Sequence, residues 1–409
     1  MKTVTLFENQ SLRTGTNFDG EAFSRKDLQE LLNFTGDSVP YFTLKKNGVH
    51  FHDFAGIIQT ENLRIEVLPR ADRSFAGPDE KGIWRKIFIQ MLAVTGIISG
   101  RPQNISSKAL KSDSLPDLLF ETFIRETEYI LHNGLIRQYR LSEGSSGSLR
   151  GRLVFGKNIQ KNSVHHEKLY TKKTEYDNVN LLNIIVHKAL LTVKRLNTGT
   201  ELSGRTGTLL LNFPEMPDMR ISSQTFEKIS FSRKSIHYKN CIETAKLILL
   251  NDHSDRKKGK NSGFALMTEL NDLWKKFIYK SILEYRKRDF SITVRTAGSL
   301  WKSEYSDRKK IKPDIILNKG SENCIVLDTK WKNSPSSEDF RRLHSASEIF
   351  GSDKTAFLLP GEKSLNGFFL NSRQGRQSEK ICRIIRIPAD INVEQWRKNI
   401  SSSVDEWMD

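Results

Sequence analysis

The chain has few cysteines, no long apolar segment and fewer acidic than basic residues. Its three cysteines, Cys241, Cys324 and Cys382, lie far apart and form neither a CxxC pair nor a zinc-ligand spacing. This usage fits a reduced, cytoplasmic setting and disfavours a disulfide framework. The longest apolar stretch, residues 87–98, is too short to cross a bilayer and is expected to form a buried helix. The first residues lack the apolar core of a secretory leader, and the sequence shows no clean basic amphipathic helix, so no membrane partner is expected.

The shortage of acidic residues leaves a large positive charge. The 409 residues include 65 Lys and Arg against 48 Asp and Glu, for a formal net charge of +17. Such a charge attracts polyanions and favours the release of counterions from phosphates. The balance favours a nucleic-acid partner, although many soluble proteins that bind no nucleic acid are equally basic.

The residue pattern predicts a multidomain protein of the α+β or α/β class, in two parts. A mixed strand-helix region, residues 1–255, precedes an α/β domain, residues 262–409. The first part contains short strands before residue 75, helices over 84–98, 116–131 and 180–196, and a Gly/Ser/basic connector over 141–162. A polar, basic linker is expected over 251–263, followed by helices over 265–288 and 337–350 and a strand over 355–359.

The clearest chemical motif is a predicted hairpin with charged residues at its open end. Pro313-Asp314 opens one apolar strand, and the next strand ends in Asp328-Thr329-Lys330. Because side chains alternate along a strand, Asp328 and Lys330 point to one face, where Asp314 can join them.

Two carboxylates held close together favour a hard divalent cation such as Mg²⁺, which prefers oxygen ligands and retains several waters. We predict Asp314, Asp328 and the backbone carbonyl of Thr329 as its ligands. Lys330 is predicted to orient or deprotonate the attacking water and to offset charge on a scissile phosphate. On pattern alone, an ordinary solvated strand face is the alternative, but the apolar run before Asp328 indicates a buried strand.

A nucleotide site within the chain is not expected. The segment from Gly151 to Asn158 imitates a phosphate-binding loop, but Asn158 stands where the loop requires a Ser or Thr. A nucleotide requirement would therefore be met by another chain. Basic clusters near the motif are candidates for DNA phosphate contacts, with a solvated surface as the alternative: residues 256–260, 286–288 and 308–310.

Taken together, short motifs along nearly the whole chain resemble McrC, the nuclease component of McrBC-type, modification-dependent restriction systems. They occur in order at residues 55–59, 65–70, 134–139, 149–153, 176–183, 313–314 and 327–332. The resemblance implies an N-terminal adaptor that docks on a hexameric, McrB-like AAA+ NTPase, usually a GTPase, and stimulates it. It also implies a C-terminal PD-(D/E)xK endonuclease domain that cuts double-stranded DNA with Mg²⁺. By motif, Asp314, Asp328 and Lys330 take the catalytic positions.

The sequence departs from the family pattern on two helices. Lys275 stands where a Glu is common on the helix before the first strand. Arg342 and Ala346 stand where a Gln and a Tyr are common on a later helix, with Asp339 retained. Two alternatives to the nuclease interpretation stay open. The chain could be a catalytically silent adaptor that only activates the NTPase, or the same nuclease could pair with an ATP-using motor of other specificity.

Overall fold

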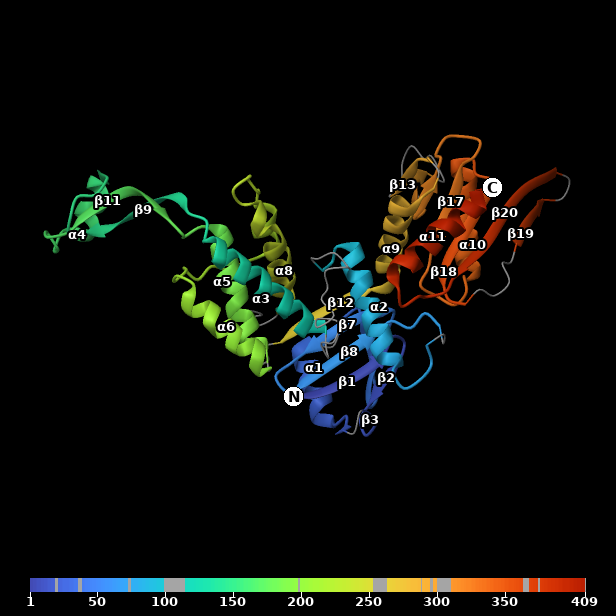
Figure 1. Cartoon of the computed structure of the whole chain (residues 1–409), viewed down its shortest axis with the longest axis horizontal. Helices are drawn as coiled ribbons and strands as arrows, with labels where there is room; N and C mark the ends of the chain where they lie inside the picture. The colour runs from blue at the N-terminus through green and yellow to red at the C-terminus, as the bar shows by residue number, and fades with distance from the viewer. Residues whose placement is uncertain are drawn as a thin grey trace. The chain divides into compact units, whose positions relative to one another are not determined.

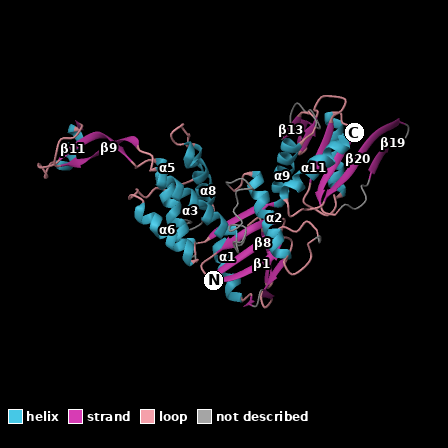
Figure 2. Ribbon diagram, viewed as in Figure 1, coloured by secondary structure: helices cyan, strands magenta, loops and turns pink. Residues whose placement is uncertain are grey.

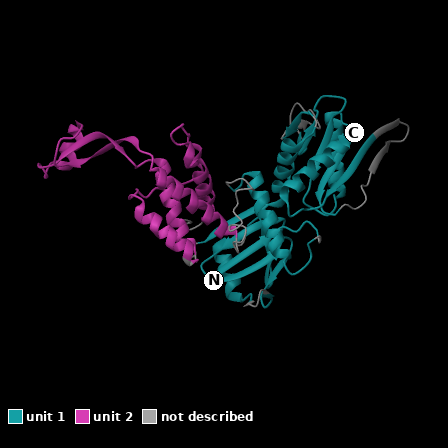
Figure 3. Ribbon diagram, viewed as in Figure 1, with its two compact units in different colours: residues 1–110, 256–409 teal, residues 111–255 magenta. Residues whose placement is uncertain are grey.

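The computed structural model describes residues 1–18, 21–35, 39–72, 75–98, 115–197, 199–252, 263–287, 289–294, 297–299, 310–362, 368–373 and 376–408. The protein is of mixed α/β type and forms two compact units, residues 1–110 with 256–409, and residues 111–255 (Figure 3). These units differ from the predicted ranges 1–255 and 262–409, because the first 110 residues group with the C-terminal part. The functional assignment of those two ranges stays a prediction. Most of the predicted linker, residues 253–262, lies outside the described residues.

The first unit contains a sheet that joins distant parts of the sequence. Its strand order is β1 (Lys2–Phe7), β8 (Leu63–Leu68), β7 (Phe54–Gln59) and β12 (Phe264–Glu269) (Figure 1). β1 runs parallel to β8, and the other neighbouring pairs are antiparallel. The helix predicted from residue 265 is therefore wrong at its start, because these residues pair with β7 instead. A Cβ at Gly56 would lie 2.0 Å from the carbonyl oxygen of Leu266, so β12 can approach only a glycine there.

A helix and several short strands surround this sheet. α1 (Arg25–Thr35) presents Leu31 and Phe34 to an apolar core that the sheet residues Val4, Ile58 and Ile65 share. The short strands are β2 (Ser11–Arg13), β6 (Gly48–Phe51) and β5 (Phe42–Lys45), which form one sheet, and the pair β3 (Asn17–Phe18) and β4 (Glu21–Ala22). The apolar segment predicted as a buried helix forms α2 (Glu80–Thr95), which carries eight buried residues.

A second sheet in the same unit carries the predicted hairpin. Its order is β13 (Ile292–Val294), β16 (Ile315–Leu317), β17 (Ile325–Thr329), β18 (Lys354–Pro360), β20 (Arg376–Ile387) and β19 (Phe368–Arg373). β16 and β17 are antiparallel, which confirms the hairpin, whereas β17, β18 and β20 run parallel to one another. β14 (Gly298–Ser299) and β15 (Lys310–Ile311) form a separate pair.

Three helices accompany this sheet: α9 (Leu270–Tyr285), α10 (Ser337–Phe350) and α11 (Val393–Met408) (Figure 2). α10 has the bounds predicted from sequence because its end signals are local. Ser336 and Asp339 form a capping box at its start, and Gly351 ends it in the left-handed conformation. α9 packs on α11 through aromatic rings, with the centroids of Trp274 and Trp396 5.4 Å apart.

The second unit combines helices with an extended ribbon. Its helices are α3 (Leu115–Asn133), α5 (Leu181–Leu196), α6 (Thr200–Asn212), α7 (Ser223–Glu227), η2 (Ile236–Tyr238) and α8 (Lys239–Leu250). α5 packs against α6 and α8 and buries nine of its residues, as its apolar sequence predicted. Among the residues that the structure describes, no helix is long and apolar enough to span a bilayer.

The ribbon, which we call the arm, consists of β9 (Gln138–Ser146), β10 (Arg152–Leu153), α4 (Phe155–Asn162) and β11 (Leu169–Asp177) (Figure 1). β9 and β11 pair antiparallel along their whole length. The prediction of a connector over 141–162 is therefore wrong, because these residues pair across the ribbon despite their Gly and Ser content. Gly151 lets β10 approach β11 closely, since a Cβ there would lie 2.4 Å from the carbonyl oxygen of Lys172.

A buried hydrogen-bond network joins the root of the arm to α5. The side-chain amide of Asn183 donates to the carbonyl oxygens of Ile136, 3.0 Å away, and Asn178, 2.8 Å away. Its oxygen accepts a 2.8 Å hydrogen bond from the Tyr238 hydroxyl. Asn180 caps α5 and also donates to the Ile136 carbonyl oxygen. Both ends of the arm are thus fixed by one buried cluster of hydrogen bonds.

Replacing Asn183 with Ala is expected to lower the free energy of unfolding of this unit by about 2 kcal/mol, because buried polar groups lose their partners. All six tryptophans lie outside residues 111–255. Urea denaturation followed by circular dichroism should show the change, whereas tryptophan fluorescence should not. Asn212→Ala is the control, since Asn212 is exposed and bonds only the carbonyl oxygen of Thr208 among the described residues. An equal loss of free energy of unfolding in both variants would mean that the hydrogen bonds of Asn183 do not stabilise the unit more than an exposed side chain does.

Candidate active site

The open end of the β16–β17 hairpin brings the predicted residues together. Ile315 pairs with Leu327, so the preceding Asp314 lies across from Asp328 at the next position of the register. Both carboxylates are buried, with exposed fractions of 6% for Asp314 and 2% for Asp328. Lys330 lies on the same face as Asp328, as the strand alternation predicted, and its Nζ is 2.9 Å from Asp328 Oδ2.

Each oxygen of the Asp314 carboxylate accepts hydrogen bonds. Oδ2 accepts from the backbone N–H of Thr329 at 2.9 Å and from its hydroxyl at 2.8 Å. Oδ1 accepts from the Lys275 ammonium at 2.5 Å. Burial alone would raise the pKa of Asp314, but the hydrogen bonds from Lys275 and Thr329 outweigh it and hold that pKa below its ordinary value.

The Asp328 carboxylate is less completely satisfied. Neither of its buried oxygens has a hydrogen-bond partner among the described residues, and only Oδ2 forms an ion pair, with Lys330. Burial, followed by the charge of Asp314, raises the pKa of Asp328, and Lys330 and Arg342 oppose this rise. Lys330 also lies 3.8 Å from Asp339 Oδ1 at the start of α10.

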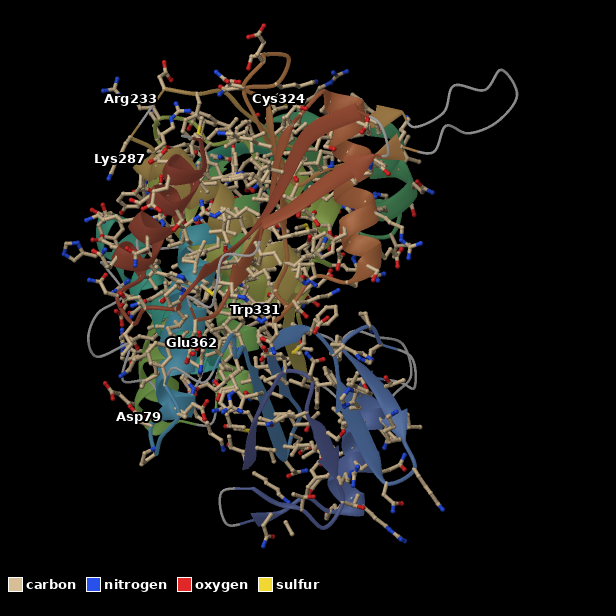
Figure 4. All side chains as sticks on the ribbon, turned by 90° about the vertical axis from the view of Figure 1, so that its right-hand side faces the viewer. Asp79, Arg233, Lys287, Cys324, Trp331 and Glu362 are labelled. Atoms are coloured by element: carbon tan, nitrogen blue, oxygen red, sulfur yellow. The ribbon has the colours of Figure 1, made fainter. Side chains whose placement is uncertain are left out.

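Trp331, the residue after Lys330, anchors the end of this strand. Its backbone N–H donates to Asn271 Oδ1 at 2.9 Å, and its indole N–H donates to Glu8 Oε1 at 3.0 Å. Its ring packs edge-on against Trp274, whose indole donates to the carbonyl oxygen of Leu358 in β18. In Figure 4, Trp331 lies close to the N-terminal strands, and Cys324 marks the other end of β17. The end of β17 is thereby fixed on α9 and on the first sheet.

Sequence reasoning missed several of these contacts. Lys275 was identified only as a departure from the family pattern, and its ion pair with Asp314 was not foreseen. A spacing of three and four residues places Asn271, Trp274 and Lys275 on one face of α9. This spacing is the signal that could have indicated that all three contact the same sheet. The other departure, Arg342, donates from its guanidinium to the Lys312 carbonyl oxygen at 3.0 Å. The predicted basic clusters lie largely outside the described residues, at 256–260, 288 and 308–309.

The donor set can accept one hard divalent cation. No group of three or more His, Cys, Asp and Glu side chains suited to a metal occurs within the described ranges. Mg²⁺, however, commonly binds proteins through one or two carboxylates and keeps its other waters. The unpartnered, buried Oδ1 of Asp328 beside Asp314 is such a donor arrangement. An unpaired carboxylate oxygen at this depth is costly unless a cation or a proton meets it.

These features define a multidomain α/β protein with a buried acid-lysine cluster at the end of one sheet. The family model described as "McrBC 5-methylcytosine restriction system component" matches residues 49–350. The chain therefore belongs to this family, which confirms the resemblance to McrC inferred from its motifs.

Individual relatives are distant in sequence. The type IV methyl-directed restriction enzyme EcoKMcrBC of Escherichia coli (strain K12) is 21% identical over 238 residues, which are 56% of this chain and 67% of the relative. A solved structure of Thermococcus gammatolerans McrB AAA+ hexamers with bound McrC gives a TM-score of 0.71 at 18% identity. The alignment covers 99% of this chain and 100% of that one, so the two share a fold. The Thermococcus gammatolerans McrBC complex matches at 20% identity with a TM-score of 0.49, covering 69% and 88% of the chains.

Proposed function

We propose that this chain is the Mg²⁺-dependent DNA endonuclease subunit of a modification-dependent restriction system and acts with an AAA+ NTPase. Its C-terminal sheet would be the PD-(D/E)xK nuclease domain. The observation that carries the proposal is the cluster of Asp314, Asp328 and Lys330, in which no described residue pairs with the buried Oδ1 of Asp328. Family membership supports the same function.

The residues of the cluster have separate roles in the proposed reaction. Asp314, Asp328 and the backbone carbonyl of Thr329 would hold Mg²⁺, which supplies Lewis-acid activation of a water and charge neutralisation at the phosphate. Lys330, held beside Asp328, would orient the attacking water and offset negative charge that develops on the phosphate. Trp331 and its anchors keep Lys330 in register, since small displacements of a catalytic group are costly.

The proposed partner is a McrB-like AAA+ hexamer that binds the nucleotide, in line with the solved complex of that relative. The arm supports an adaptor role because it exposes apolar side chains. Tyr139 and Tyr176 pair across its strands with ring centroids 4.8 Å apart, and they are 78% and 56% exposed. Phe155 and Ile159, one helical turn apart on α4, are each 71% exposed. Clustered exposed apolar side chains are typical of protein interfaces.

Reconstitution tests the function. The chain is mixed with a McrB-like AAA+ protein from the same source, Mg²⁺, and GTP or ATP, and methylated and unmethylated plasmids are compared. Cutting that requires nucleotide and Mg²⁺ is expected, and preference for the methylated plasmid would establish modification dependence. Absence of cutting, together with NTP hydrolysis that rises when the chain is added, would instead support the catalytically silent adaptor.

The arm makes a separate prediction. The double variant Phe155→Asp/Ile159→Asp should bind the AAA+ hexamer about tenfold more weakly, because two charges would have to be buried at the interface. Titration of the stimulated NTP hydrolysis measures this change. The matched control is Leu211→Asp, which alters an 88% exposed apolar residue on α6, outside the arm. Equal stimulation by the double variant and the control would remove the arm from the docking surface.

A further inference from the structure

We propose that Lys275 acts as a built-in cation that limits this site to one divalent metal ion and weakens its binding. The inference rests on the proposed nuclease function and deepens it, since it concerns the metal content of the same site. The proposed reaction described above gives Lys275 no role, and this inference assigns it one.

The position of Lys275 is fixed by its helix. Two neighbours on the same face of α9 bond the catalytic sheet: Asn271 accepts from the backbone N–H of Trp331, and Trp274 donates to the Leu358 carbonyl oxygen. Trp274 is fully buried. With its helix held at both points, Lys275 places its ammonium on Asp314 Oδ1 and keeps about a third of its side chain exposed.

The hydrogen bonds leave room for one metal ion. Asp314 Oδ2 already accepts two hydrogen bonds from Thr329, and Asp314 Oδ1 accepts one from Lys275. Asp328 Oδ2 is paired with Lys330. Among the described residues, no hydrogen bond or ion pair reaches the fourth oxygen, Asp328 Oδ1. A metal ion on this oxygen can still share a lone pair of Asp314, whereas a second ion would displace the Lys275 ammonium.

The charges support the same conclusion. Two carboxylates and two ammonium groups give the four side chains a net charge of zero before any metal binds. A carboxylate at position 275 would give three negative charges against one positive. Because like charges repel strongly at such short range, the Lys275 ammonium must lower the affinity of the site for a divalent ion.

Mn²⁺ binding to the full-length chain, counted by electron paramagnetic resonance and isothermal titration calorimetry, tests the proposal without any measurement of cleavage. The wild-type protein should bind one ion at this site. Lys275→Gln should bind it at least about tenfold more tightly, because a positive charge is removed. Lys275→Glu should bind a second ion. Lys276→Ala is the matched control, since Lys276 is the next residue of the helix and is exposed.

The outcomes separate this inference from the proposed function. Unchanged affinity and ion number in both Lys275 variants, with binding that Asp328→Asn abolishes, would overturn only the role of Lys275. Mn²⁺ binding that is absent from the wild type and from both variants would overturn the metal site itself. Tryptophan fluorescence and circular dichroism verify that each variant is folded, and Lys275→Met replaces any variant that is not.

Discussion

Replacing Asp328 with Asn is expected to reduce DNA cleavage by about a thousandfold or more. The change removes the negative charge of a buried carboxylate whose Oδ1 has no hydrogen-bond partner among the described residues, and with it the metal-binding character of that oxygen. It also removes the ion pair that holds Lys330 at 2.9 Å. Loss of a metal ligand together with a positioned lysine amounts to at least about 4 kcal/mol of transition-state stabilisation. Initial rates of plasmid cutting, with the AAA+ partner and nucleotide present, measure this loss.

Two further measurements make the result specific. The Asp328→Asn chain should stimulate NTP hydrolysis by the partner as well as the wild type does, because the substitution lies far in sequence from the arm and preserves side-chain shape. Asp353→Asn serves as the control, since Asp353 is exposed and lies immediately before β18. Cleavage that persists in Asp328→Asn would mean that the acid-lysine cluster is not the catalytic site.

Local signals in the sequence predicted local structure well. The β16–β17 hairpin follows from two apolar runs around a polar turn, and its register places Asp314 across from Asp328. The bounds of α10 follow from a capping box at Ser336 and a glycine at position 351. The alternation of side chains along β17 predicted that Asp328 and Lys330 share a face, and their ion pair confirms this.

Contacts between distant residues could not be predicted in the same way. β12 pairs with β7 about two hundred positions earlier, and nothing in the apolar run at 264–269 distinguishes such a strand from the first turn of a helix. The arm forms strands from a Gly- and Ser-rich segment because β11 supplies partners for its backbone. Glu8 and Trp331 are separated by 323 positions. Each of these features depends on tertiary pairing rather than on local preference.

The contact between Glu8 and Trp331 leads to the second large effect, a dependence of stability on pH. Glu8 follows β1, and its Oε1 accepts hydrogen bonds from the Trp331 indole and, at 2.8 Å, from the backbone N–H of Arg70. Its Oε2 is buried without a hydrogen-bond partner among the described residues. Burial, aided by the charge of Asp53 and only partly opposed by these hydrogen bonds, raises the pKa of Glu8 from 4.5 to about 7.

This raised pKa determines the direction of the effect. Below about pH 4.5, Glu8 is protonated in both the folded and the unfolded chain. Between that value and about 7, only the folded chain retains the proton, and above 7 the folded chain must bury a charge. The free energy of unfolding therefore falls as the pH rises through this window. A rise in pKa of this size lowers the free energy of unfolding by about 3 kcal/mol across the window.

Glu8→Gln should abolish this part of the pH dependence, because a neutral amide can still accept both hydrogen bonds through its oxygen. Relative to the wild type, the variant should gain about 3 kcal/mol in the free energy of unfolding between pH 4.5 and 8. Urea denaturation at a series of pH values, followed by tryptophan fluorescence, measures the free energy of unfolding of the unit that contains Trp331. Glu61→Gln, at an exposed position in the turn before β8, should follow the wild-type profile. Parallel profiles for wild type and Glu8→Gln would mean that Glu8 is already ionised in the folded protein, so its contact with Trp331 would be an ordinary charge-assisted hydrogen bond.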